Sequence, residues 1–254
     1  GVKLMGIGNS ELKWQKTKQW NVGTDLELIK NRFAFNFDYY SKLTDDLLSD
    51  VNLPTSAGFS SFKSNVGQVE NRGFEIGANA YIIRNTSKQL IWSVGGTMIH
   101  NVNKIKKISN YLEYLNSLME NEQDVNPSFM YKEGESINTI FAVRSQGIDP
   151  SNGKEIYVKK DGTLTYVWDS KDKVACGINE PKYLGTFNTR LRYQGWQLSA
   201  IFSYRFGGQI YNSTLASKIE NNYPYNNSDK RALYDRWSLE NPNARYKAVS
   251  DFST

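Results

Sequence analysis

Residues 185–206 read GTFNTRLRYQGWQLSAIFSYRF and consist of two alternating runs on either side of Gln194-Gly195. A two-residue turn at this pair would place Tyr193 opposite Trp196, because glycine accepts the positive φ that such a turn requires. The same register pairs Leu191 with Leu198, Thr189 with Ala200 and Phe187 with Phe202. Side chains alternate along a strand, so these pairs share an apolar face, while arginine, serine and amide side chains occupy the other. Such a hairpin can cover a water-soluble core, or it can separate lipid from a wet lumen.

Two further hairpins follow the same pattern. Residues 20–28 and 32–40 alternate around Lys30-Asn31, and a two-residue turn there would pair Leu28 with Phe33. Residues 71–102 form the third hairpin, with an expected turn at 85–88 and an apolar face that includes Ile82. Each hairpin therefore has one apolar and one polar face.

The composition bounds the class of protein. The 254 residues include 13% aromatic residues and 16 tyrosines, yet the mean hydropathy is −0.58, so apolar residues are dispersed by alternation. No run approaches the roughly 18 apolar residues of a membrane helix. Cys176 is the single cysteine, which excludes an intrachain disulfide and a Cys/His zinc motif. A net charge of +5 with one small lysine cluster favours a solvated surface over a nucleic-acid site.

The lengths of the connections between strands indicate whether the hairpins cover a water-soluble core or separate lipid from a lumen. Turns inside the hairpins span about two to four residues, whereas 41–70, 103–184 and the segment after 206 are long. Short turns at one end and long loops at the other are typical of outer-membrane barrels, and strands of about 9–11 residues suffice to cross a membrane. Aromatic residues beside the short turns would form an interfacial girdle; these are Phe33, Tyr81, Trp92, Tyr193 and Trp196. We therefore predict an all-β fold, an antiparallel transmembrane β-barrel portion with short periplasmic turns and long extracellular loops.

The long connections contain local structure of their own. Helical spacing of apolar residues predicts an amphipathic helix over 107–121, whose stripe packs on its own loop or meets a partner. An Asp161-Gly162 turn predicts a small hairpin between 155–158 and 163–168. Ser228 or Asp229 is expected to cap a short helix that runs to Trp237.

The sequence does not support an enzyme, a metal site or a cofactor site. His100 is the single histidine, lies at the end of an alternating strand and has no catalytic motif around it, so we assign it to the membrane interface or a loop base. Asp45-Asp46 and the Asp149/Asp161 pair lack calcium-loop spacing and suit turn solvation better.

Binding by loop aromatics is the more credible chemistry. Flat rings beside amide side chains suit sugar rings or extended peptides, although for any single ring the sequence favours loop packing. The candidate ligand-binding residues are Tyr131, Tyr157, Trp168 and Tyr211.

Several phrases occur in a characteristic order along the chain. They are NSELKWQKT at 9–17, DYYSKLTDDLL at 38–48, NRGFE at 71–75, GIDP at 147–150, GGQIYN at 207–212 and RWSLENP at 236–242. Together they resemble the SusC/RagA family of TonB-dependent outer-membrane transporters. Ser10, Gln15 and Thr186 stand where proline, glutamate and glycine are common in that family.

The resemblance implies a function and an architecture. It implies import of glycan or peptide oligomers across the outer membrane of a Gram-negative, Bacteroidetes-like bacterium, with a SusD-like surface lipoprotein and TonB as partners. Residues 1–254 would then be one section of the barrel domain, about six of 22 strands, with the plug domain and closing strands outside this chain. The alternative is a secreted or surface β-rich module that binds carbohydrate without transport.

Overall fold

The computed structural model describes residues 8–53, 58–121, 124–221 and 227–248. It divides into two compact units that we describe separately. The sheet unit comprises Gly1–Leu115, Tyr131–Thr139 and Ile178–Gln209, and the loop unit comprises Asn116–Met130, Ile140–Gly177 and Ile210–Thr254.

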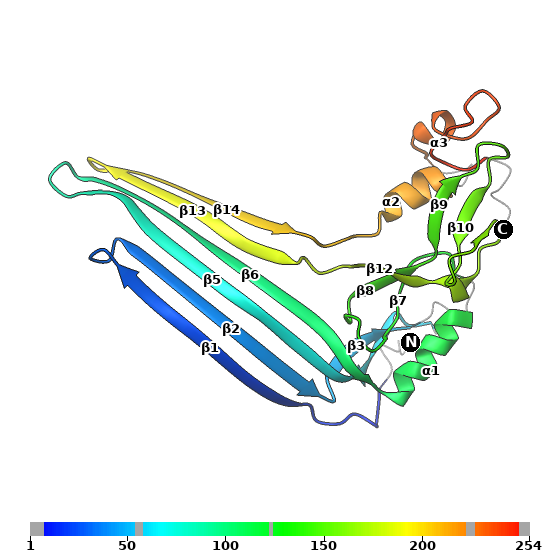
Figure 1. The fold of residues 1–254 in the computed structure, drawn as a ribbon, viewed down its shortest axis with the longest axis horizontal. Helices are drawn as coiled ribbons and strands as arrows, with labels where there is room; N and C mark the ends of the chain where they lie inside the picture. Colours follow the sequence, from blue (N-terminus) through cyan, green and yellow to red (C-terminus); the bar gives the residue numbers. More distant parts are fainter. Residues whose placement is uncertain (1–7, 54–57, 122–123, 222–226, 249–254) are drawn as a thin grey trace, which may run out of the picture. The chain divides into compact units, whose positions relative to one another are not determined.

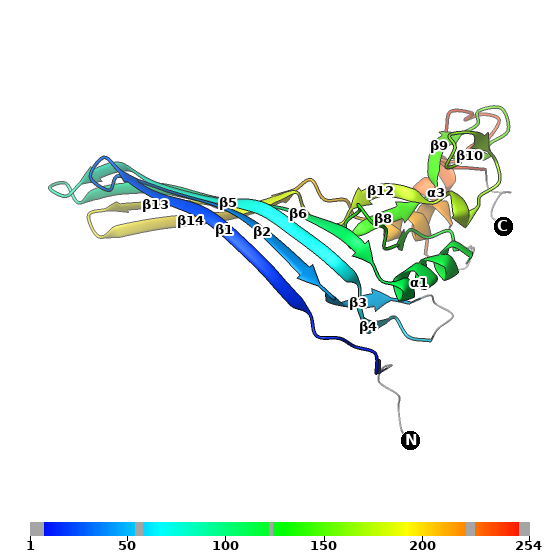
Figure 2. The ribbon, with the colours of Figure 1, turned by 60° about the horizontal axis from the view of Figure 1, so that its bottom comes forward.

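Within the described residues, the sheet unit is built on six antiparallel strands in the order β1-β2-β5-β6-β13-β14. Their bounds are Lys16–Leu28, Phe33–Asp45, Gly67–Asn85, Leu90–Ile108, Tyr183–Tyr193 and Trp196–Phe206. The long strands lie side by side, and their short turns gather at one end of the sheet (Figures 1 and 2). This architecture confirms the predicted antiparallel barrel portion, which is open at β1 and β14 and does not close on itself.

The registers of two hairpins agree with the sequence analysis. Tyr193 pairs with Trp196 and Leu28 pairs with Phe33, and the deeper pairs follow in step. Gln194 and Gly195 both have positive φ, as a tight hairpin turn requires. The β1–β2 turn differs from the prediction, because residues 29–32 form a four-residue loop in which three consecutive residues are left-handed, at φ values between 53° and 60°. The longer loop keeps the expected pairing because it adds one residue on each side of Lys30-Asn31.

The β5–β6 hairpin departs further from the prediction. Tyr81 pairs with Ser93 and Ile83 pairs with Trp92, so Ile82 is an extra residue that forms a bulge. Asn85 stays in the strand, where its Oδ1 accepts a hydrogen bond from the Lys88 N–H at 2.9 Å, and the turn moves to 86–89. Both strands have 19 residues, which is well beyond the expected 9–11. They continue past the predicted membrane-crossing length and carry structure at the loop end of the sheet.

Aromatic rings line the apolar face in two bands. Near the short turns lie Phe33, Trp92, Tyr193 and Trp196, as predicted. Tyr81, which was also predicted to belong to this girdle, instead pairs with Ser93 on the opposite, polar face. A second band, which we did not predict, crosses the sheet nearer its loop end through rings that contact one another at centroid distances of 4.7–6.3 Å. Its members are Phe37, Phe74, His100, Tyr183 and Phe206. Tyr183 and Tyr193 end the 11-residue β13, so at about 3.3 Å per residue and a tilt of about 40° the bands lie about 25 Å apart, the height of a barrel's apolar band.

The loop end of the sheet unit has its own apolar cluster. A small hairpin of β3 (Leu48–Asn52) and β4 (Ser61–Asn65) and the first turns of α1 (Asn110–Asn121) pack on the extended ends of β5 and β6. The fully or nearly fully buried members are Val51, Val66, Val69, Ile105, Leu112 and Leu115. The helix starts later than the predicted residue 107, because β6 pairs with β5 as far as Ile108. Leu112 and Leu115 are buried, so the stripe packs on its own loop, while Tyr111 and Tyr114 remain exposed.

The loop unit combines short strands with short helices. Two three-stranded sheets include β9 (Arg144–Ile148), β10 (Glu155–Val158) and β11 (Leu164–Thr165), and β7 (Ser128–Phe129), β8 (Thr139–Ala142) and β12 (Val174–Ile178). The predicted hairpin at 155–168 is therefore present with a shorter second strand. Helical segments are η2 (Ser170–Asp172), α2 (Ser213–Leu215), the π-helical η3 (Ala216–Glu220) and α3 (Arg231–Tyr234). The helix expected to reach Trp237 is thus one turn long, although the Asp229 side chain does accept a hydrogen bond from the Arg231 N–H.

None of the helices in the described part of the chain is long and apolar enough to cross a membrane.

The two faces of β2 provide a test of the environment of the sheet. Phe35 lies on the apolar face opposite Leu26 and Ala78, and Asn36 points to the other side. In the full-length protein, Phe35→Arg should lower the folded, heat-modifiable fraction in outer membranes, because arginine on a lipid face costs roughly 2–4 kcal/mol at midplane. Asn36→Arg should leave that fraction nearly unchanged. Equal loss in both variants would contradict the assignment of lipid and lumen faces.

Candidate functional site

The loop unit contains a cavity of about 880 Å³, which we call the loop cavity. This volume falls in the range of small-molecule sites, roughly 300–1,000 Å³. Its aromatic lining comes from Tyr157, Trp168, Tyr211 and Tyr246, and its charged lining from Glu155, Glu220, Arg245 and Lys247. Flat rings beside groups of both charges can hold a polar oligomer by stacking and hydrogen bonds.

The acidic side of the loop cavity is partly desolvated. The Tyr157 hydroxyl donates a hydrogen bond to Glu155 Oε2 at 3.0 Å, which fixes that carboxylate. Burial raises the pKa of Glu220, and the nearby Glu155 charge raises it further. Burial also raises the pKa of Tyr211, with smaller contributions from Glu220 and Asp124. The pKa is raised because the surroundings disfavour the Glu220 carboxylate. A cationic or hydrogen-bonding group of a ligand would therefore stabilise this charge.

Three of the four candidate residues from the sequence meet at this cavity. Tyr157, Trp168 and Tyr211 are far apart in sequence, and β10, the segment after β11 and the segment before α2 bring them together. Lys173 lies with its amine 5.8 Å from the centre of the Trp168 ring, so one face of that indole is already covered by a cation. Tyr131 instead belongs to the sheet unit, where it is 4% exposed within the apolar cluster. With so little surface available, Tyr131 has a packing role.

Arg236 is the residue around which the helical side of the loop unit is organised. The residue is 4% exposed, and its guanidinium donates to the carbonyl oxygens of Ala232 at 2.6 Å, Lys247 at 3.0 Å and Glu220 at 2.9 Å, and also to that of Ile219. These carbonyls lie at the ends of η3 and α3 and beside the chain's last described residues. Helix ends leave carbonyl groups without backbone partners, and a buried guanidinium supplies several donors at once. Burial lowers the pKa of Arg236, with Glu220 opposing the shift.

The turn between β9 and β10 is held by two sets of contacts. Asp149 accepts hydrogen bonds from the Tyr166 hydroxyl at 2.5 Å and from Ser151, and its pKa is lowered to about 2 chiefly by these side-chain bonds. Gly153, at φ +75°, lies under Trp237, whose Nε1 donates to the Pro150 carbonyl at 3.0 Å. A Cβ on Gly153 would approach the indole to 2.5 Å, so only glycine fits there. Asp149 and Asp161 each bind their own turns, which accords with the turn role predicted for them.

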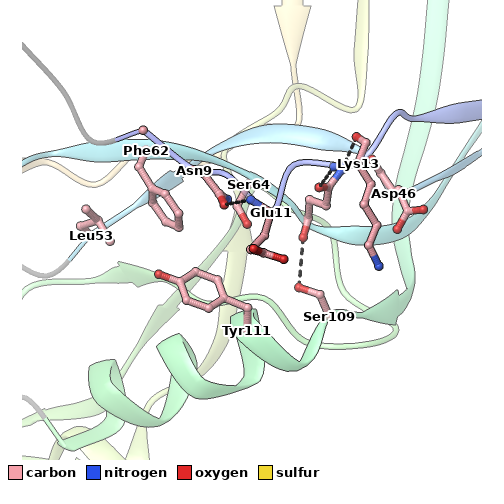
Figure 3. A pocket seen from close by; sticks show the side chains of 11 residues that line it. Asn9, Glu11, Lys13, Asp46, Leu53, Phe62, Ser64, Ser109 and Tyr111 are labelled. Atoms are coloured by element: carbon pink, nitrogen blue, oxygen red, sulfur yellow. Dashed lines mark hydrogen bonds between the residues drawn. The ribbon is translucent and has the colours of Figure 1, made fainter.

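A second cavity, of about 460 Å³, lies in the sheet unit between the segment before β1, the β3–β4 hairpin and the start of α1. Figure 3 shows the rings of Phe62 and Tyr111 on one side and the Glu11 carboxylate facing them. Asn65 binds the segment before β1 through the Lys13 N–H at 2.8 Å and the Lys13 carbonyl at 3.0 Å. The Ser109 hydroxyl donates to the Asn65 carbonyl at 3.0 Å, so one residue joins three segments. This geometry makes Asn65 a structural organiser of the cavity.

The sequence analysis did not identify most of the charged residues that line the loop cavity. It also did not identify the roles of Arg236 and Asn65, which hold neighbouring segments together. Arg236 and Trp237 were recognised as part of a family phrase, but the pattern did not reveal their contacts. Glu220, Arg245 and Lys247 carry no local signal, because polar residues in a long loop are ordinary. Only the fold shows that they line the same space as the aromatic candidates.

Arg236 provides a stability test. In the full-length protein, Arg236→Met should leave several buried carbonyls unpaired, at roughly 1–3 kcal/mol each, and should speed proteolysis of the loop unit. Arg236→Lys should rescue only part of the loss, because an ammonium group cannot reach the same set of carbonyls. The exposed Arg231→Met, which loses its bond to Asp229, is the matched control and should have little effect. Heat modifiability should remain normal in all three variants; equal protease resistance of Arg236→Met and Arg231→Met would refute this role.

The chain matches a known family along nearly its whole length. The family described as "TonB dependent receptor-like, beta-barrel" matches residues 4–254. TonB-dependent receptor P3 of Formosa agariphila is 29% identical over 230 residues, which are 85% of this chain and 23% of that protein. TonB-dependent receptor SusC of Bacteroides thetaiotaomicron is 26% identical over 242 residues, 89% of this chain and 23% of that protein.

The fold is also similar to a solved structure. A chain in the structure of the RagAB peptide transporter superimposes with a TM-score of 0.76 at 24% identity, over 97% of this chain and 27% of that chain. The chain thus spans about a quarter of the length of these relatives. The six-stranded meander and the family match agree, and this chain belongs to the TonB-dependent receptor family as a section of its β-barrel.

Proposed function

We propose that the protein to which this section belongs imports oligomeric nutrients across the outer membrane in a TonB-dependent process. The observation that carries the proposal is the family match over residues 4–254 together with a sheet whose apolar face has no cover within the described residues. On that face Phe187 is 47% exposed and Leu198 is 68% exposed. A soluble binding module would have to bury such a face, whereas lipid satisfies it directly.

The cargo is a glycan or a peptide oligomer, and the loop cavity is its proposed contact. Tyr157, Trp168 and Tyr211 offer stacking surfaces, and Glu155 with Arg245 offers groups of both charges. The RagAB neighbour is described as a peptide transporter, and SusC is a TonB-dependent receptor. The relatives give no evidence for catalysis, and we assign the protein no enzymatic activity.

Two protein partners complete the proposal. A SusD-like surface lipoprotein would sit at the loop end of the barrel, where the exposed Tyr111 and Tyr114 of α1 are available as contacts. TonB would act through a segment outside these 254 residues. Gentle detergent extraction of the full-length protein should recover the lipoprotein, and its consistent absence would contradict this part of the proposal.

Uptake by cells tests the loop cavity. Trp168→Ala combined with Tyr211→Ala should weaken cargo binding roughly thirtyfold, since an aromatic residue that anchors a ligand costs about 1 kcal/mol or more when truncated. Tyr234→Ala is the control, because that ring is 71% exposed on α3 and does not line the cavity. The measurement is uptake of labelled oligosaccharides and labelled peptides by cells that carry the full-length variants. Normal uptake of both cargo classes by the double variant would contradict the binding role and indicate that these aromatic residues only pack within the loops.

Labelling of intact cells tests the orientation in the outer membrane. The exposed Cys176 is first replaced by serine, so that the background carries no reactive thiol from this section. An impermeant maleimide should then label Asn152→Cys in the β9–β10 turn and spare Asn31→Cys in the β1–β2 turn. Short turns are expected on the periplasmic side and long loops outside the cell. The reverse labelling pattern would invert the orientation.

A further inference from the structure

The sheet has a polar face, which we call the inner face, and the apolar face that carries Phe35, which we call the outer face. We call the aromatic band that includes Phe74 and His100 the loop-end band. From the short turns to the loop-end band, the outer positions of the six described strands are uncharged. Within these strands, charged side chains appear on the outer face only beyond that band. The two ends of the outer face therefore differ in charge, although both have aromatic rings.

Basic residues dominate the outer face beyond the loop-end band. Arg72 lies in the first row, opposite Ser41 of β2, which in turn lies opposite Trp20 of β1. Lys18 and Lys104 lie at the two ends of the second row. We call these cations, together with those further along the strands, the cationic patch; its members are Lys16, Lys18, Arg72, Lys104, Lys106 and Lys107.

A bulge on β6 adds two lysines to the cationic patch. Ile105 and Ile108 both belong to the buried apolar cluster on the inner side of the strand. The two residues between them, Lys106 and Lys107, lie opposite a single residue of β5, and Lys106 Nζ is 3.0 Å from Glu70 Oε2 on the outer face. Strict alternation from Ile105 would instead turn Lys107 inward, toward the cluster. The bulge therefore keeps the core apolar and places both lysines on the outer side.

The described residues do not neutralise the cationic patch. Two carboxylates share its face: Glu70, which pairs with Lys106, and Asp45, whose Oδ1 accepts a hydrogen bond from Gln68 Nε2 at 2.6 Å. Three cations form no ion pair within the described part of the chain, and these are Lys18, Arg72 and Lys104. Like charges on one face of a sheet repel one another, so anions from another molecule would stabilise this region.

The depth of the cations indicates the chemistry of that molecule. At about 3.3 Å per residue and a tilt of about 40°, two residues advance about 5 Å along the membrane normal. Arg72 therefore lies about 5 Å beyond the loop-end band, Lys18 and Lys104 about 10 Å, and Lys16 about 15 Å. The headgroup layer of an ordinary bilayer is about 5–8 Å thick on each side. Arg72 fits such a layer, whereas the lysines need a headgroup that extends further, as one built from sugars does.

The lateral spread of the cations favours more than one phosphate. Three strand spacings separate Lys18 from Lys104, which is about 14 Å at about 4.8 Å per spacing. Between them, the exposed Trp20 ring lies 5.6 Å from the Tyr39 ring and presents an amphipathic surface in the row of Arg72. β13 and β14 end at the loop-end band, so the cationic patch is confined to the sector from β1 to β6.

We propose that the cationic patch binds the headgroup of a phosphorylated glycolipid of the outer leaflet, with its phosphates against Lys18, Arg72 and Lys104. The acyl chains of this lipid lie on the apolar outer face, so one continuous surface matches both halves of the molecule. A protein partner fits the observations less well, because it would have to lie in the leaflet beside the barrel wall. The inference rests on the outer-membrane location in the proposed function and adds a lipid ligand that is separate from the cargo.

Native mass spectrometry of the full-length protein in detergent tests the lipid site. Titration with bisphosphorylated lipid A should give discrete lipid-bound masses, and dephosphorylated lipid A should bind much more weakly. Lys18→Gln with Arg72→Gln and Lys104→Gln should weaken lipid A binding at least about tenfold. The physical reason is that each basic residue near an anionic membrane surface contributes up to about a factor of five.

Two sets of variants separate the site from a general effect of charge. Lys154→Gln with Lys159→Gln and Lys171→Gln removes the same charge from exposed positions of the loop unit and should leave lipid A binding unchanged. A charge-conserving exchange at the three patch residues, lysine to arginine and arginine to lysine, should retain binding, because both side chains bind phosphate. Heat modifiability of each variant establishes that its barrel is folded.

The outcomes separate this inference from the transport proposal. Equal binding by the two glutamine triple variants, equal binding of dephosphorylated lipid A, or full displacement of lipid A by millimolar inorganic phosphate would each overturn the lipid site. Loss of a co-purifying protein from the patch variant, with lipid A binding unchanged, would also overturn it and assign the patch to a protein partner. Normal lipid A binding by a protein that takes up neither cargo would support the lipid site and count against the transport function alone.

Discussion

Every backbone N–H and C=O group that crosses a bilayer must find a partner within the protein, and here the hydrogen-bonded ladder meets this requirement between β1 and β14, whose outer edges are open. Strand pairing runs without interruption from β1 through β14, apart from one bulge on β5 and one on β6. An uninterrupted ladder forces strict alternation of side chains, so one choice of register decides which residues meet lipid and which meet the lumen. The two faces of the sheet are therefore a consequence of backbone pairing.

The same strands pass through different surroundings along their length. On the inner face, Asn79 and Gly95 lie in an open polar region, whereas Val69 and Ile105 further along β5 and β6 are buried. The change occurs where β3, β4 and α1 cover the strand ends. The 19-residue strands β5 and β6 thus cross the membrane and also provide the base on which the apolar cluster of the sheet unit packs. This explains why α1 begins after Ile108 and not at residue 107, where the spacing of apolar residues predicted it to start.

The loop unit is stabilised in another way. It has small apolar clusters, such as that around Ile219 and Tyr246, and it depends on a buried guanidinium to pair the ends of its helical segments. In short helices most backbone N–H and C=O groups lie near an end, so many of them need hydrogen-bond partners from side chains. The carbonyls that Arg236 binds include those of Glu220 and Lys247, and both residues line the loop cavity. The wall of the proposed binding site is therefore built by the same contacts that hold the unit together.

The sequence alone determined the hairpin registers at Gln194-Gly195 and between Leu28 and Phe33, the apolar and polar faces, and the candidate aromatics Tyr157, Trp168 and Tyr211. These features follow from a period of two residues and from turn chemistry, which act between neighbours in the chain. The tertiary structure decided the bulge at Ile82, the burial of Tyr131 and the meeting of three distant aromatics with Glu220 and Arg245 in one cavity. Those outcomes depend on contacts between segments far apart in sequence, and no local pattern encodes which of many polar loop residues will come together.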